Sequence, residues 1–154
     1  MARPFFWLTV CCLVCVVVPY GTAEEPQNPQ IKQDLQLLAG TWVQVYRIED
    51  GKTISLDKDV KVLLTMQERA FTLREGDRII KQGTFTVTPL RLFPGLDFIS
   101  MDREGKKTTA LATFEVTPHQ LRLCMTREGK PRPEGLTSKE GSGLILLTFQ
   151  RVKP

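Results

Sequence analysis

The sequence is poor in the residues that most enzymes use for chemistry. It has one histidine, His119, and beyond its first fifteen residues one cysteine, Cys124. One imidazole and one thiol cannot supply the ligands of a usual zinc site, and nothing in the sequence orients His119 toward Cys124. A lone strand cysteine is most often a packing residue, although Arg122 on the same strand face could activate it as a thiolate. We therefore predict that the protein is not an enzyme and uses no metal or cofactor.

Long blocks of one charge are also missing. Basic and acidic residues are interspersed in turn-like segments such as Asp57-Lys58-Asp59 and residues 74–78, whereas a nucleic-acid-binding face is a patch of one sign. The glycine-rich tract Gly141-Ser142-Gly143 lacks the lysine and hydroxyl residue of a phosphate-binding loop. The sequence therefore predicts no nucleic-acid partner and no nucleotide site.

The first 23 residues have the pattern of a secretory signal. Arg3 precedes an uncharged, mostly apolar run at residues 5–18, Pro19 breaks the run, and Gly21 and Ala23 are small residues at the positions that signal peptidase reads. The run of 14 residues is short for a membrane span, which needs about 20. We expect an exported protein, periplasmic or extracellular, that is not an integral membrane protein after cleavage. The alternative is an uncleaved N-terminal anchor.

Removal of residues 1–23 leaves 131 residues, which suits one domain. Three of the four cysteines are lost with the leader, so the exported domain has no internal disulfide and depends on packing. Residues 24–33 are rich in proline and glutamine and are expected to form a flexible tether. The folded domain is expected at residues 34–154, where Asp34 caps a short helix that Gly40 ends.

Strand patterns dominate the rest of the chain. Alternating apolar and polar residues separated by turn residues predict eight strands, at residues 41–48, 60–66, 70–74, 79–87, 96–101, 108–116, 120–126 and 144–152. Mostly short connections favour antiparallel neighbours in a meander. We therefore expect an all-β fold, an eight-stranded antiparallel up-and-down barrel with a short N-terminal helix. An open sandwich of the same strands is the alternative.

Residues of the first and last predicted strands resemble a known sequence signature. Gly40-Thr41-Trp42 after a short helix, together with Arg151 in the last strand, resembles the signature of lipocalin-type barrels. The ordered set of motifs resembles an uncharacterised family of secreted lipocalin-like domains abundant in planctomycete bacteria. Besides Gly40-Thr41-Trp42, these motifs are Asp50-Gly51-Lys52, Lys81-Gln82-Gly83-Thr84-Phe85, Leu121-Arg122-Leu123-Cys124, Lys130-Pro131-Arg132-Pro133 and the Gly141-Ser142-Gly143 tract that precedes Arg151. The resemblance implies a lipocalin-like fold and export, and no settled activity.

Gly40, Trp42 and Arg151 are expected to form the base of the barrel. Arg151 shares strand parity with apolar Leu147 and Phe149, which is an unusual place for a charge without a partner. Stacking of its guanidinium on the indole of Trp42 would supply one, at about 0.5–2 kcal/mol. The alternative is that Arg151, three residues from the C-terminus, frays into solvent.

The expected interior can hold a ligand or be filled by side chains. An eight-stranded barrel is just wide enough for either, and Gly83 on an inward face leaves room. The leading hypothesis is a non-catalytic binding module for a small lipophilic ligand; the alternative is a structural or protein-interaction domain with a filled interior. The candidate lining residues are Phe71, Leu73, Gly83, Phe85 and Val87.

A long, proline-rich connection at residues 127–140 is a candidate for a loop at the barrel's mouth. Its basic residues Arg127, Lys130 and Arg132 could meet an anionic group. The alternative is a rigid, solvated loop.

We predict that the exported protein begins at Glu24, because only Gly21-Thr22-Ala23 matches the peptidase site. N-terminal sequencing of protein recovered outside the cytoplasm checks this. Exported protein that still begins at Met1 would instead support the anchor.

Overall fold

The computed structural model describes residues 28–101, 104–127 and 129–153. The expected leader and the first part of the tether lie outside these residues. In the described part, no helix is long and apolar enough to cross a membrane.

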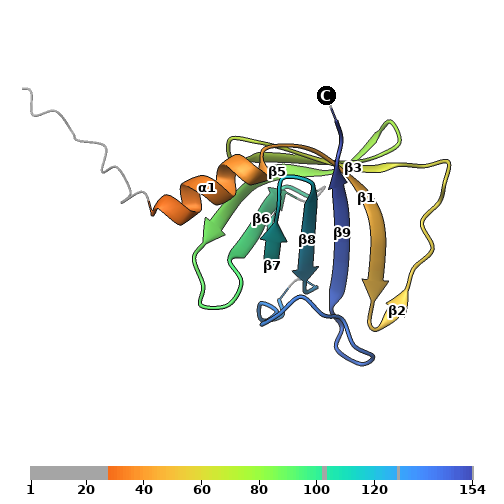
Figure 1. The fold of residues 1–154 in the computed structure, drawn as a ribbon. Helices are drawn as coiled ribbons and strands as arrows, with labels where there is room; N and C mark the ends of the chain where they lie inside the picture. Colours follow the sequence, from red (N-terminus) through yellow and green to blue (C-terminus); the bar gives the residue numbers. More distant parts are fainter. Residues whose placement is uncertain (1–27, 102–103, 128, 154) are drawn as a thin grey trace, which may run out of the picture.

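The strands form one closed antiparallel barrel, as predicted (Figure 1). The sheet runs in the order β2-β1-β3-β4-β5-β6-β7-β8-β9, and pairing of β1 with β9 closes it. The strands are β1 (Gly40–Glu49), β2 (Lys52–Thr53), β3 (Val62–Gln67), β4 (Ala70–Glu75), β5 (Arg78–Thr88), β6 (Gly95–Met101), β7 (Lys107–Val116), β8 (Gln120–Met125) and β9 (Ile145–Arg151). The eight long strands match the eight predicted ones within one or two residues at each end.

The short strand β2 was not predicted. It forms a two-residue hairpin with the end of β1, at the register Glu49↔Lys52. Asp50 and Gly51, which form the turn, both have positive φ, 51° and 78°. This is the backbone that an Asp-Gly turn supplies most easily, so the turn was expected and the extra pairing follows from it.

The helix begins earlier than expected. α1 spans Pro29–Leu38, and the side chain of Asn28 accepts a hydrogen bond from the backbone N–H of Gln30 at 3.0 Å. Asn28 is therefore the N-cap, with proline at the first helical position. Asp34 lies inside the helix, is buried and accepts from Gln30 Nε2 at 2.9 Å. The cap assigned to Asp34 was wrong, and residues 29–33 belong to the helix rather than to a tether.

α1 lies across one end of the barrel, in contact with β5 and β7 (Figure 1). Leu38 is fully buried, and Ile31 and Leu35 pack against the barrel core. The helix therefore covers one end of the interior.

Trp42 and Arg151 form that end, as predicted. The register places them directly opposite each other on β1 and β9, and the centre of the Arg151 guanidinium lies 4.1 Å from the centroid of the Trp42 ring. The indole is fully buried and donates from Nε1 to the carbonyl of Leu38 at 2.9 Å. The cation–π contact is thus joined by a hydrogen bond to the end of α1.

Arg151 also binds backbone carbonyls, which the sequence had not indicated. Its Nη1 donates to Ala39 O at 2.6 Å and its Nη2 donates to Leu37 O. Its Nε donates to Pro118 O at 2.7 Å in the β7–β8 turn. The guanidinium thus satisfies the last carbonyls of α1, which have no partner within the helix.

Gly40 makes room for this arrangement. Its φ of 128° is a conformation that favours glycine, and a Cβ there would lie 2.5 Å from Arg151 Nη1. The three residues assigned to the barrel base therefore form one contact set.

We predict that Trp42→Ala lowers the free energy of unfolding by about 3–5 kcal/mol, as a fully buried aromatic truncation. Arg151→Ala should cost about 1–3 kcal/mol, because it leaves several carbonyls without a donor. The two losses should not add, since the side chains touch. Urea unfolding of both single variants and the double variant measures the coupling.

Arg151→Lys is the matched control for charge. A lysine keeps the cation but not the planar fork, so it should recover only a small part of the loss. Strictly additive losses of unfolding free energy in the double variant would contradict the contact between Trp42 and Arg151.

Candidate functional site

Described side chains in the barrel interior enclose a small apolar cavity. It has a volume of about 70 Å³ and is lined by side chains from β3 through β9. Leu64, Leu73, Phe98 and Leu147 form much of its wall, and exposed Lys81 stands among them. The cavity therefore reaches solvent beside a lysine.

Large side chains fill the interior toward α1. Trp42, Phe85, Phe114 and Phe149 are each at most 1% exposed, and all belong to one core cluster. Phe71 and Phe98 meet edge to face, with ring centroids 4.9 Å apart, at the cavity wall. Phe149 belongs to both the packed core and the cavity wall, so the cavity lies directly beside these large side chains.

Of the five candidate lining residues, two line the cavity and three do not. Phe71 and Leu73 line the cavity. Phe85 and Val87 face inward and belong to the packed core, outside the cavity wall. Gly83 does not line it either.

Gly83 has a different role from the one expected. A Cβ at this position would lie 2.0 Å from the carbonyl oxygen of Ile99 on β6. The glycine therefore lets two strand backbones approach closely and does not provide space for a ligand. Any larger residue there would disturb the β5–β6 pairing.

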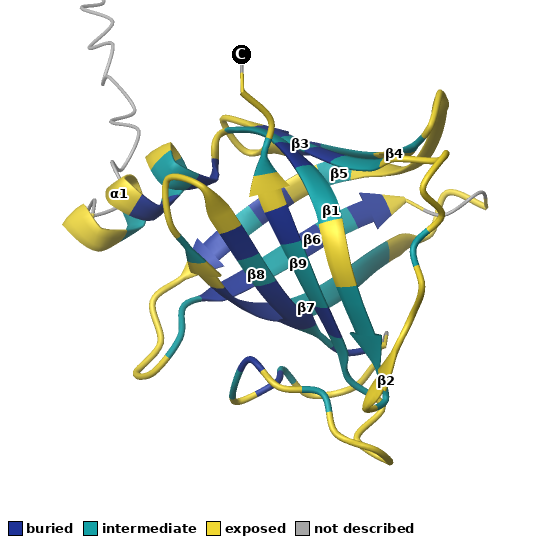
Figure 2. Ribbon diagram, turned by 45° about the vertical axis from the view of Figure 1, so that its right-hand side comes forward, coloured by how far each residue is buried: buried dark blue, intermediate teal, exposed yellow. Residues whose placement is uncertain are grey.

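The connection between β8 and β9, residues 126–144, lies against the outside of the barrel. Leu136 packs with Cys124 and Leu146, on the outward faces of β8 and β9, in a second buried cluster. Thr113 Oγ1 donates to Gly135 O at 3.3 Å, and Arg122 Nη2 donates to Leu136 O at 3.5 Å. In Figure 2 the connection lies below β7 and β8 and includes buried segments. We call it the outer loop.

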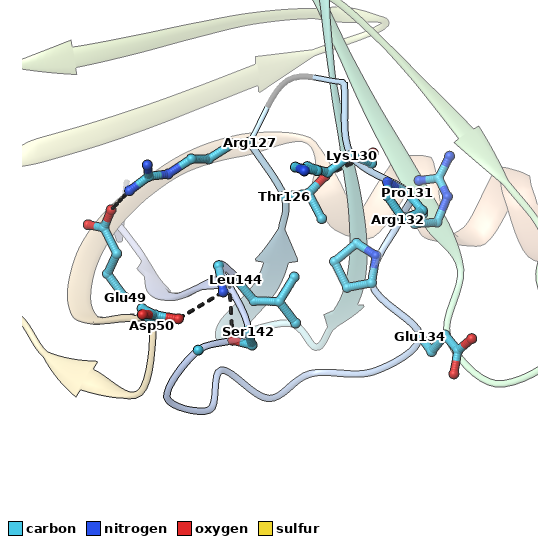
Figure 3. Close-up of a pocket in the computed structure, with 13 residues that line it drawn as sticks. Glu49, Asp50, Thr126, Arg127, Lys130, Pro131, Arg132, Glu134, Ser142 and Leu144 are labelled. Atoms are coloured by element: carbon cyan, nitrogen blue, oxygen red, sulfur yellow. Dashed lines mark hydrogen bonds and ion pairs between the residues drawn. The ribbon is translucent and has the colours of Figure 1, made fainter.

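An open hollow of about 750 Å³ lies between the outer loop and the end of β1 (Figure 3). The three basic residues of the expected mouth loop line it, but they do not converge. Figure 3 shows Arg127 extending toward Glu49 while Arg132 points to the opposite side. Lys130 is exposed between them.

Arg132 fastens the outer loop to the barrel wall. Its Nη2 lies 2.5 Å from Asp97 Oδ1, and its Nη1 donates to Ala112 O at 2.5 Å. The two side chains of the ion pair are only 19% and 20% exposed. Because its guanidinium is already bound to these two groups, Arg132 holds the loop in place and is not a free anion-binding group.

Arg127 forms an ion pair with Glu49 Oε1 at 3.3 Å, and Arg47 Nη2 binds the other oxygen of the same carboxylate at 2.7 Å. The hydrogen bond and charge of Arg47, followed by those of Arg127, hold the pKa of Glu49 below its usual range. One carboxylate therefore serves two guanidinium groups.

The thiol and the imidazole are kept apart. Cys124 is fully buried beneath the outer loop, where its Sγ donates to Thr137 O at 3.5 Å. Burial raises the pKa of this thiol, which opposes the thiolate form that a nucleophile needs. His119 is exposed in the β7–β8 turn. Arg122, the expected activator, instead pairs with Glu115 at 3.2 Å.

The sequence reasoning missed Lys81, Gln44 and Arg47. Lys81 had a signal, because it shares strand parity with inward Phe85. Gln44 had one as well, because it shares strand parity with Trp42, whereas Arg47 had none, because its facing depends on an irregularity in β1. In the described part of the chain, no group of three or more residues suited to a metal comes together.

We predict that Arg132→Ala frees the outer loop and exposes Cys124. In the wild type the thiol should react slowly with a thiol-specific reagent under native conditions, and in the variant at least tenfold faster. Mass spectrometry of the peptide that contains Cys124 measures the rate at this one site. Lys130→Ala, in the same loop, is the control that should leave the rate unchanged. Equal rates in all three proteins would contradict the role of Arg132 in holding the outer loop over Cys124.

Comparison with known proteins finds no relative of this chain. No family model matches the chain, and no curated protein or solved structure matches it. Evidence for function therefore comes from the barrel, its cavity and the residues around them.

Proposed function

We propose that the protein is an exported, non-catalytic binding module that takes a small, partly apolar ligand into the barrel interior. The observation that carries this proposal is the apolar cavity of about 70 Å³, which reaches solvent beside Lys81. Apolar walls with few polar groups are the usual chemistry of small-molecule sites.

The size of the cavity limits what part of the ligand enters. Small-molecule sites generally measure about 300–1,000 Å³, and a buried cavity that takes up benzene measures about 150 Å³. At about 70 Å³, the interior accepts the end of a short aliphatic chain, and the rest of the ligand lies at the mouth. Each methylene buried there contributes about 0.8 kcal/mol.

A second function is favoured by a separate observation. The interior is mostly filled, and β5 and β6 expose Ile79, Ile80 and Met101 at 47%, 45% and 67%. Exposed apolar side chains on neighbouring strands suit a protein partner. In that case the barrel is a scaffold and the cavity is a packing defect.

Ala110→Leu tests the cavity. Ala110 lines it, and the added carbons should fill the space while keeping the melting temperature within a few degrees of the wild type. Hexan-1-ol is the probe, followed by NMR of the leucine and alanine methyl groups. We expect saturable shifts in the wild type and none in the variant.

Thr109→Leu is the matched control. Thr109 is the next residue along β7 and pairs with Ile99, so its side chain is on the outer face and the substitution should not affect binding. A wild type without saturable shifts, together with a destabilised Ala110→Leu, would overturn the binding proposal and leave the interaction domain. Native mass spectrometry of protein from its own host then identifies any ligand carried.

A further inference from the structure

Two polar side chains of β1 face the barrel interior. The register places Gln44 opposite Phe149 and Arg47 opposite Leu147, and both of these partners line the cavity. Residues directly opposite in an antiparallel pair lie on the same face of the sheet. Gln44 and Arg47 therefore stand inside the barrel beside the cavity.

Both side chains carry a buried donor without an acceptor. Gln44 Nε2 and Arg47 Nε are inaccessible to solvent and have no hydrogen-bond partner. Most buried polar groups in proteins are hydrogen-bonded, so each exception calls for a physical reason. Acceptor atoms brought by a ligand would supply the missing partners.

The charges around these donors favour an anion. Glu49, opposite Ile145 on the same inner face, is shared by Arg47 and Arg127 at 2.7 and 3.3 Å. Lys81 adds a further cation at the cavity wall. At the neighbouring β4–β5 hairpin, Glu75 and Arg78 pair with each other at 2.6 Å. Asp50 lines the same hollow as Glu49 and Arg127, so three cations, Arg47, Arg127 and Lys81, stand against two carboxylates.

We propose that the ligand's polar end is a carboxylate, bound by Arg47 and Gln44, while its short apolar tail occupies the cavity that Lys81 lines. A carboxylate has two acceptor oxygens and pairs well with the planar guanidinium. This inference rests on the proposed function and narrows its ligand to a short carboxylate-bearing amphiphile. It assigns binding roles to three residues that the sequence did not single out.

The test compares hexanoate, hexan-1-ol and hexylamine, which share a tail and differ in headgroup. We expect the wild type to bind hexanoate at least tenfold more tightly than hexan-1-ol, and hexylamine most weakly, by isothermal titration and NMR. Arg47→Met should remove the preference for hexanoate and keep the affinity for hexan-1-ol. Glu49→Gln should increase the affinity for hexanoate, because it releases Arg47 from its intramolecular partner.

Lys81→Met is a second variant, at an exposed position where folding is not at risk, and it should weaken hexanoate binding several-fold. Lys32→Met, at an exposed position on α1, removes the same charge far from the cavity and should change nothing.

The outcomes separate the two proposals. Equal affinities for hexanoate and hexan-1-ol, or a preference that survives both Arg47→Met and Lys81→Met, would overturn the carboxylate inference and leave the binding function standing. Saturable binding of none of the three probes would overturn both.

Discussion

The closed end of the barrel depends on the contacts of one guanidinium group. Arg151, in the last strand, lies over Trp42 of the first strand at 4.1 Å and donates to backbone carbonyls at the end of α1 and in the β7–β8 turn. A helix end leaves carbonyls without intrahelical partners, and Trp42 and Arg151 stand opposite each other where the first and last strands pair. One side chain satisfies both requirements because its planar fork offers several donors while its face stacks on the ring.

An irregularity in β1 decides what the interior contains. The register shifts between Gln44 and Tyr46, so the inward positions change from Trp42 and Gln44 to Arg47 and Glu49. A β-bulge inserts one residue and reverses the facing of all that follow. Tyr46 and Ile48 are thereby turned outward, where Ile48 packs in the cluster beneath the outer loop. Without the shift, the apolar residues would enter the barrel and the ion pair would leave it.

The role of the outer loop also depends on contacts between residues that are distant in the sequence. Its prolines and basic residues suggested a loop at the mouth, but Arg132 binds Asp97 at 2.5 Å and Leu136 packs on Cys124. These partners lie 35 and 12 positions away in the sequence, on strands whose outer faces the barrel brings together. The loop therefore covers a second small core on the outer wall, which keeps the only described thiol from solvent.

The sequence by itself determined the architecture. Strand periodicity and turn residues have local causes, so they located the eight long strands, the Asp50-Gly51 turn and the Gly40–Trp42–Arg151 base. It also supplied Phe71 and Leu73 as cavity residues, because parity places them inward. Only the tertiary structure decided that Gly83 serves a close strand approach and that Arg47 points into the barrel, opposite Leu147 of the cavity wall. Such roles are set by the register between strands that are distant in sequence. One bulge or one close backbone contact changes which side chains point into the barrel, so strict alternation along a strand no longer predicts it.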